Sequence, residues 1–254
     1  MYRLTNYPIV FFLVSFAMLW LAAWVGARLS RRQTLKEGTR EDFGVIQAAT
    51  LTLLGLILGF SFSMAIGRYD QRKNLESEEA NAIGTEYLRA DLLPAADAAK
   101  VKELLKIYTK QRIAFYTTRD LEEYRQISLR TAKLQGELWS AVQVPAVAQP
   151  TPLAALATAG MNDVLNSQSY TQAAWWNRIP VMAWSLMVII AICCNVLIGY
   201  GARDAKAERT LLMVLPLVVS TTFMLIADID SPRGGLIRVH PQNLESFLDS
   251  LQPQ

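Results

Sequence analysis

The stretch TLTLLGLILGFSFSMAIGRYDQRKNLESEEAN, residues 50–81, passes from an apolar segment to a charged one with no proline between them. Its first half is apolar enough to cross a bilayer, and the helical periodicity continues unbroken into its charged second half. The sequence therefore predicts one helix that leaves the membrane and continues into water.

Two rows of residues at four-residue spacing lie side by side on this predicted helix, about 100° apart around its axis. The small residues of the first row are Gly55, Gly59, Ser63 and Gly67. The larger residues of the second row are Thr52, Leu56, Phe60 and Met64. We call them the small row and the large row.

The small row predicts a helix-packing face, because small residues let a second helix approach closely within a membrane. The large row is a candidate pore neck, formed by Thr52, Leu56 and Phe60, if several subunits present it to a common axis. Such a ring of apolar side chains gates ions by excluding water. The alternative interpretation is that both rows pack inside a single four-helix bundle.

Composition indicates a membrane protein with no nucleic-acid partner. Of the 254 residues, 52% are hydrophobic, and the mean hydropathy is +0.20, which is unusual for a soluble domain. Lysine and arginine number 25 against 22 acidic residues, so the charge is nearly balanced. The two cysteines, Cys193 and Cys194, are neighbours in an apolar run, so the sequence supports neither a disulfide framework nor a zinc site.

Hydrophobic runs predict an all-α, four-span integral membrane protein with one membrane domain over residues 1–254. A cleaved signal peptide is a weaker alternative for the first run, because that run is longer than the usual apolar core of a signal. The predicted spans are residues 8–27, 43–66, 179–200 and 211–227. A helical extramembrane layer at about 68–178 separates the second and third spans, and a tail follows at 228–254.

Two local signals subdivide the predicted extramembrane layer. Asp120 is a candidate N-cap for a helix that runs through Trp139. The stretch VPAVAQPTP, residues 144–152, contains three prolines and predicts a hinge or loop.

The sequence lacks the motifs of the common enzyme classes, and its only histidine is His240. We therefore predict no catalytic residue, no cofactor and no metal site. The acids Glu76, Glu78, Glu79 and Glu86 predict a solvated helical face paired with nearby basic residues. A divalent-cation or acid–base site is the alternative for these four acids.

Three charged residues lie where predicted spans end. Asp228 and Asp230 follow the fourth span, and Arg68 follows the second. Because a partly buried carboxylate needs a partner, we expect a membrane-edge charge network in which Arg68 pairs with one or both acids. Ion coordination or gating is the alternative role for the acids.

The string LGLILGFSFSMAIGRYDQRKNL, residues 54–75, resembles the pore helix of the bestrophin channels. More closely, the whole chain resembles a bacterial family of bestrophin-like membrane proteins. Its hallmarks here are GRYDQRKNLESEEANAIGTEYLRADLLP at 67–94 and ADIDSPRGGLIRV at 227–239. Asp70 departs from the bestrophin pattern, which usually has a second aromatic residue at that position.

The resemblance implies an oligomeric ion channel, possibly a pentamer, in the bacterial inner membrane, with the second span lining an apolar-necked pore. Leu56 and Phe60 would form the neck. Thr52 stands where bestrophins usually carry a third apolar residue, a departure that would shorten or wet the gate. The implied partners are the lipid bilayer, further copies of the chain and inorganic ions. The rival hypothesis is a non-conducting membrane scaffold or sensor whose helical layer binds a partner.

Overall fold

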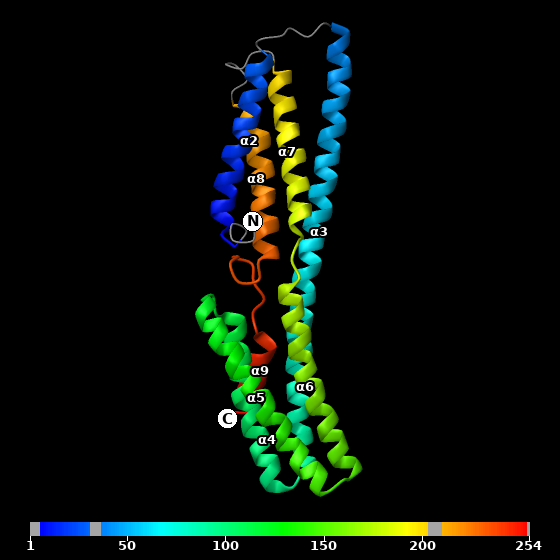
Figure 1. The fold of residues 1–254 in the computed structure, drawn as a ribbon, viewed down its shortest axis with the longest axis vertical. Coiled ribbons are helices and arrows are strands. Elements are labelled where there is room, and N and C mark those ends of the chain that lie inside the picture. Colours follow the sequence, from blue (N-terminus) through cyan, green and yellow to red (C-terminus); the bar gives the residue numbers. More distant parts are fainter. Residues whose placement is uncertain (1–5, 31–36, 203–209, 253–254) are drawn as a thin grey trace. The chain divides into compact units, whose positions relative to one another are not determined.

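A computed structural model describes residues 6–30, 37–202 and 210–252, and this described part consists of helices joined by short connections (Figure 1). The helices are α2 (Pro8–Ser30), α3 (Glu37–Arg89), α4 (Ala95–Thr117), α5 (Leu121–Ala148), α6 (Pro152–Trp176), α7 (Val181–Gly201), α8 (Leu211–Asp230) and α9 (Gln242–Ser250), with the 3-10 turn η1 (Ala90–Leu92) after α3. The predicted all-α fold is confirmed.

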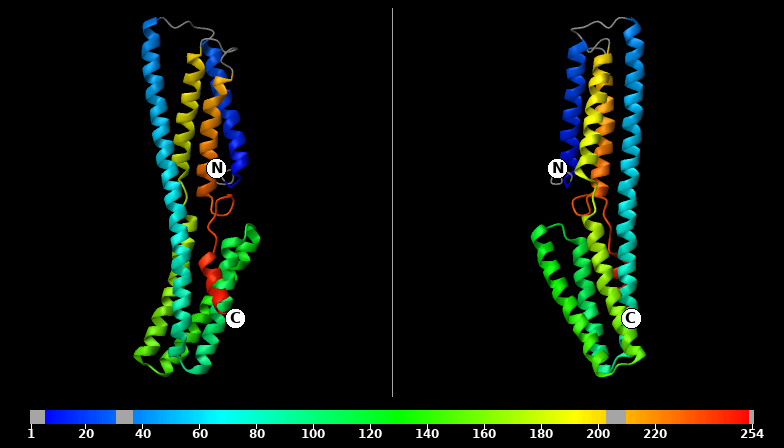
Figure 2. Two further views of the ribbon diagram at one scale, coloured as in Figure 1. Left: turned by 180° about the vertical axis from the view of Figure 1, so that it is seen from behind. Right: turned by 45° about the vertical axis from the view of Figure 1, so that its right-hand side comes forward.

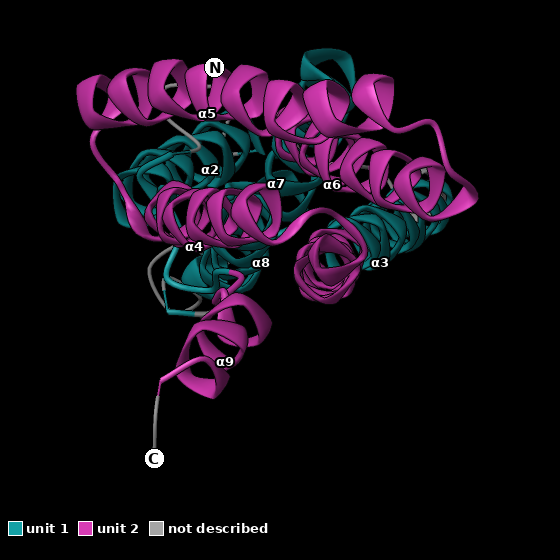
Figure 3. Cartoon of the chain, turned by 90° about the horizontal axis from the view of Figure 1, so that it is seen from below, with its two compact units in different colours: residues 1–68, 178–238 teal, residues 69–177, 239–254 magenta. Residues whose placement is uncertain are grey.

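The chain forms two compact units, which Figure 3 shows in separate colours. Unit 1 contains Met1–Arg68 and Arg178–Arg238, and unit 2 contains Tyr69–Asn177 and Val239–Gln254. Helix α3 contributes its first part to unit 1 and its last part to unit 2. The tail that was predicted as one segment from residue 228 is likewise divided between the units after Arg238.

Within the part of the chain that the structure describes, four helical segments are long and apolar enough to cross a membrane, in agreement with the predicted number of spans. The segments are Pro8–Ser30, Arg40–Leu92, Pro152–Gly201 and Leu212–Asp230. Helix α3 has 53 residues, whereas about 20 residues are enough to cross a bilayer. It therefore continues well beyond the membrane as a single helix.

In unit 1, α2 packs against both α7 and α8 (Figure 2). Near its start, the Phe11 ring lies 5.3 Å from that of Trp184 in α7 and 6.2 Å from that of Phe223 in α8, between centroids. All three side chains are buried. This aromatic cluster fixes the three helices at one end of the unit.

Glycines of α2 and α7 allow these two helices to approach each other closely. A Cβ on Gly26 would meet the backbone of Val196, and a Cβ on Gly199 would meet the backbone of Ala23. Small residues permit such backbone contact between membrane helices. The small row of α3 takes no part in it.

Unit 2 is built from the last part of α3 together with α4, α5, α6 and α9. In its core, Phe115 and Tyr116 of α4 pack on Trp175 of α6, with ring centroids 4.7 and 5.4 Å apart. Leu244 of α9 is also buried there. These contacts join segments that are far apart in the sequence.

Helix α5 starts as the sequence predicts but ends later. The Asp120 carboxylate accepts hydrogen bonds from the backbone amides of Glu122 and Glu123 at 2.7 and 2.8 Å, so the predicted N-cap is confirmed. The prediction of a hinge or loop at 144–152 is wrong for most of that stretch, because α5 continues to Ala148 with Pro145 inside it. Pro145 lies on the buried face of α5, where apolar packing offsets the hydrogen bond that proline cannot donate.

The acids of α3 do not form the predicted solvated face. Of the four acids named in the prediction, Glu78 is exposed, whereas Glu76, Glu79 and Glu86 are buried in unit 2. Buried positions recur at intervals of three and four residues along this part of α3. The acids thus lie on the packed side of the helix, and each needs a partner or a proton.

Glu76 binds the start of α9. One of its carboxylate oxygens accepts hydrogen bonds from the backbone amides of Asn243 and Leu244 at 3.0 and 3.1 Å, and the other accepts one from the Asn243 side chain at 2.6 Å. The first amides of a helix lack partners within the helix and carry a partial positive charge. Glu76 therefore caps α9 and holds it in unit 2.

Candidate functional site

The large row of α3 is exposed within the single chain. Leu56 and Phe60 are 53% and 65% exposed, and Thr52 and Met64 are also exposed. The Thr52 hydroxyl donates a hydrogen bond to the Ala48 carbonyl at 2.9 Å, so its polar hydrogen is satisfied on its own helix. The row therefore presents an apolar surface that no other described part of the chain covers.

The small row is equally uncovered. A Cβ added to Gly55, Gly59 or Gly67 would meet no atom within 4 Å, and Ser63 is exposed. The alternative in which both rows pack inside a single four-helix bundle is therefore not what unit 1 shows. The two rows are therefore free to contact molecules other than the described part of this chain.

A different face of α3 packs inside unit 1. Leu54, Leu58 and Ala65 are buried. At the start of the helix, the Phe43 ring lies 5.6 Å from that of Tyr200 in α7, between centroids. Helix α3 is thus held to α7 by one face, and it leaves the two predicted rows free.

The structure brings Arg68 and Asp230 together at the end of the spans. The Arg68 guanidinium lies 3.4 Å from the Asp230 carboxylate, and both side chains are largely buried. The same carboxylate accepts hydrogen bonds from the Ile179 backbone amide, at 3.1 Å to each oxygen. Asp230 therefore joins Arg68, in the middle of α3, to the segment that precedes α7.

Asp228 does not pair with Arg68, the basic partner that the sequence suggests, but binds backbone amides. Its two carboxylate oxygens accept hydrogen bonds from the backbone amides of Leu236 and Ile237 at 2.7 and 2.8 Å. A Cβ on Gly235 would meet the Asp228 carbonyl, so the returning chain fits closely against the end of α8. Asp228 thus holds this loop in place, whereas Asp230 is the acid that pairs with Arg68.

Sequence reasoning missed Asn6 as a member of this region. Its side-chain oxygen accepts hydrogen bonds from Arg178 at 2.8 Å and from the Ser231 hydroxyl at 3.1 Å. A Cβ on Gly234 would meet the Asn6 backbone. An asparagine 172 positions before its arginine partner carries no local signal of this role.

The Arg68–Asp230 contact predicts energetic coupling. We expect Arg68→Ala and Asp230→Ala each to lower thermal stability, and the double variant to lose about 1 kcal/mol less than the sum of the two. Asp228→Ala supplies the control, because Asp228 binds backbone amides and should be additive with Arg68→Ala. Simple additivity for Asp230 as well, measured by thermal unfolding in detergent, would rule out the pairing.

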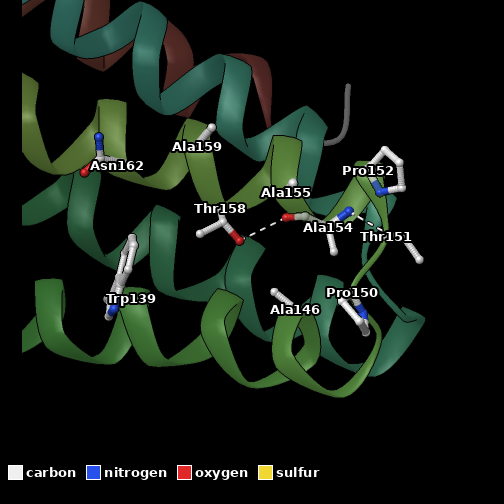
Figure 4. A pocket seen from close by; sticks show the side chains of 10 residues that line it. All are labelled: Trp139, Ala146, Pro150, Thr151, Pro152, Ala154, Ala155, Thr158, Ala159 and Asn162. Carbon is white, nitrogen blue, oxygen red and sulfur yellow. Dashed lines mark hydrogen bonds between the residues drawn. The ribbon is translucent and has the colours of Figure 1, made fainter.

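A groove in unit 2 offers no reactive group. It lies between the end of α5 and the start of α6, has a volume of about 690 Å³ and is lined by ten residues, none of them titratable (Figure 4). The Thr158 hydroxyl in its wall donates a hydrogen bond to the Ala154 carbonyl at 2.9 Å. Among the described residues there is also no group of three or more His, Cys, Asp or Glu side chains that could hold a metal ion.

Comparison with known proteins assigns the chain to a family. Residues 12–244 match the bestrophin-like domain. The chain belongs to the bestrophin-like family. This confirms the resemblance seen in residues 67–94 and 227–239. A search among curated proteins finds no match to this bestrophin-like chain.

Solved structures share the fold of this bestrophin-like protein. One is a bacterial bestrophin homologue from Klebsiella pneumoniae determined by Zn-SAD phasing, with 12% identity and a TM-score of 0.63, covering 96% of this chain and 99% of that chain. A mutant of a bacterial bestrophin homologue from the same organism has 11% identity and a TM-score of 0.64, covering 94% of this chain and 93% of that chain. The likeness extends over nearly the whole of both chains.

Proposed function

We propose that this bestrophin-like protein is an ion channel in which several copies of the chain surround a pore lined by α3. The observation that carries the proposal is the exposure of α3. Only 6% of its most apolar stretch is buried within the chain, against 33% for α2 and 44% for α8. A span that its own chain covers so little is suited to contact other subunits on one side and a pore on another.

The two rows of α3 divide these contacts in the proposal. The small row around Gly59 packs against a neighbouring subunit, since small-residue rows are typical of helix contacts within membranes. The large row turns to the common axis, where Leu56 and Phe60 form a neck that controls ions by excluding water. Thr52 lies beside the neck on the same row; its hydroxyl hydrogen is bonded to its own helix, whereas its oxygen can still accept a hydrogen bond from water and wet this end of the neck.

The resemblance of α3 to the bestrophin pore helix supports the same assignment and implies a pentamer. The proposed location is the bacterial inner membrane, and the transported species are inorganic ions. An apolar neck carries no charge that would select anions over cations, so the proposal leaves the sign of the ion to measurement.

Replacing Gly59 by valine tests the proposed assembly. Because a Cβ on Gly59 meets nothing within the chain, the variant subunit should fold, but its branched side chain should separate neighbouring subunits. We expect most of the oligomer and of the ion flux in liposomes to be lost, measured by particle mass in detergent and by flux assay.

Leu53→Val is the matched control for Gly59→Val, since Leu53 is exposed on the same helix but belongs to neither row. It should keep the mass and the flux of the natural protein. Equal mass and flux for the two variants would contradict the assignment of the small row to a subunit contact.

A further inference from the structure

Glu86 differs from the other buried acids of α3. Glu76 caps α9, and Glu79 is bound to Arg112. Glu86 is 0% exposed, yet neither of its carboxyl oxygens has a hydrogen-bond partner. Among the buried carboxyl groups that the structure describes, it is the only one in this condition. An ionised carboxylate is strongly disfavoured in such a place, whereas a protonated one is tolerated far better.

Helix α6 packs directly over Glu86. The residue of α6 at this point is Gly160, and a Cβ there would meet a Glu86 carboxyl oxygen and the Arg89 guanidinium. Glycine thus permits the α6 backbone to approach the carboxyl group closely. Any water drawn to an ionised Glu86 would have to separate α3 from α6 at this contact.

The charges around Glu86 are balanced only when it carries a proton. Arg89 on its own helix and Asp163 on α6 are the charged groups that act on it, and these two lie 3.9 Å apart. In the adjoining η1, Asp91 is bound to Lys102 of α4 at 2.6 Å. The Arg89 guanidinium therefore faces two carboxyl groups, those of Glu86 and Asp163. When Glu86 is neutral, these three side chains together carry no net charge.

We propose that Glu86 is a proton-operated switch in unit 2: the protonated carboxyl group keeps α3 and α6 in contact, and loss of its proton opens that contact. The switch requires no bound ligand other than the proton. The switch lies on α3, the helix assigned to the pore in the proposed function. It is nevertheless a property of unit 2 alone and does not require that the protein conducts ions.

The pH range follows from the surroundings of the carboxyl group. Burial raises the pKa of Glu86 from 4.5 to about 8, with Arg89 lowering it and Asp163 raising it further. Below pH 4.5, Glu86 is protonated whether α3 and α6 are in contact or apart, and the closed state keeps its full advantage. As pH rises, the open state loses its proton first, so the advantage of the closed state declines and is lost by about pH 8.

Hydrogen exchange on the full-length protein in detergent micelles tests the switch. After correction for the intrinsic exchange rate, protection of the amides around Glu86 and Gly160 should fall about tenfold per pH unit between pH 6 and 8, and should level off above that. Glu86→Gln, which stays neutral, should show constant protection. Glu78→Gln, an exposed acid on the same helix, should behave as the natural protein does.

An infrared titration of the natural protein gives a second test that does not depend on a variant folding. The C=O band of a protonated carboxyl group should be present at pH 6.5 and should be lost as the pH rises to about 8, because opening of the contact favours the deprotonated form. Absence of that band at pH 6.5, or a Glu86→Gln variant with the same pH-dependent protection as the natural protein, would overturn the proposal. Neither measurement involves ion flux, so a negative result here leaves the proposed channel function to its own tests.

Discussion

Replacing both Leu56 and Phe60 by alanine is expected to raise ion flux into liposomes about tenfold or more. The two side chains are the largest of the proposed neck, and both are exposed on α3. Removing them widens the constriction and lets water enter it, which lowers the barrier to ions. A barrier lower by about 1.4 kcal/mol corresponds to a tenfold faster passage.

The neck variant must still assemble for its flux to be informative. Leu53→Ala removes a similar exposed side chain from the same helix and should leave flux unchanged, since it lies off the large row. If the Leu56→Ala and Phe60→Ala double variant assembles normally but conducts as the natural protein does, these residues do not form the gate.

Replacing Arg112 by methionine is expected to destabilise unit 2 by about 3–5 kcal/mol. Arg112 and Glu79 are almost completely buried, at 1% and 0% exposure of their side chains. Arg112 binds both oxygens of Glu79, whose carboxylate also accepts hydrogen bonds from Tyr116 at 3.1 Å and Thr171 at 3.4 Å. Without the guanidinium, the hydrogen-bond partners that the described residues offer this buried carboxylate are two neutral hydroxyl groups.

The loss of stability should arise from the unpaired charge of Glu79 and not from lost packing. Glu79→Gln added to Arg112→Met should therefore recover a large part of the stability, as measured by chemical unfolding in detergent. Lys133→Met, which removes a cation from an exposed pair on α5, should cost less than about 1 kcal/mol. A loss of that small size for Arg112→Met would show that the buried pair contributes little.

The α3 rows illustrate what the sequence could predict. Periodicity alone places Leu56 and Phe60 on one line of the helix and Gly59 on the next, because helical spacing is a local property. It does not tell which line another helix covers. The structure answers this for one chain, where Leu54 and Leu58 are buried and both predicted rows are not.

The acids of α3 were misjudged because their partners are distant in sequence. Glu79 follows the spacing of a buried face, but a rule that treats glutamate as polar assigns it to solvent. Its partner Arg112 is 33 residues further on, and the sequence around Glu79 gives no sign of this pairing. Burial of the pair depends on how α3 and α4 meet, which is a tertiary property.

The membrane-edge charges were partly accessible to the same reasoning. The need of a carboxylate for a partner correctly directs attention to Asp228 and Asp230. Choosing between a cation and backbone amides requires the path of the loop after α8, which returns Leu236 and Ile237 to Asp228. That path is set by close contacts of glycines, which charge patterns do not reveal.

The central claim is that several copies of this chain share a pore lined by α3. The mass of the purified protein particle in detergent, measured by native mass spectrometry, tests it most directly. The account predicts a single closed assembly of identical subunits, with a mass of five times the 28.4 kDa chain if the bestrophin arrangement holds. A particle that remains a monomer or a dimer under conditions that preserve the fold would contradict a shared pore.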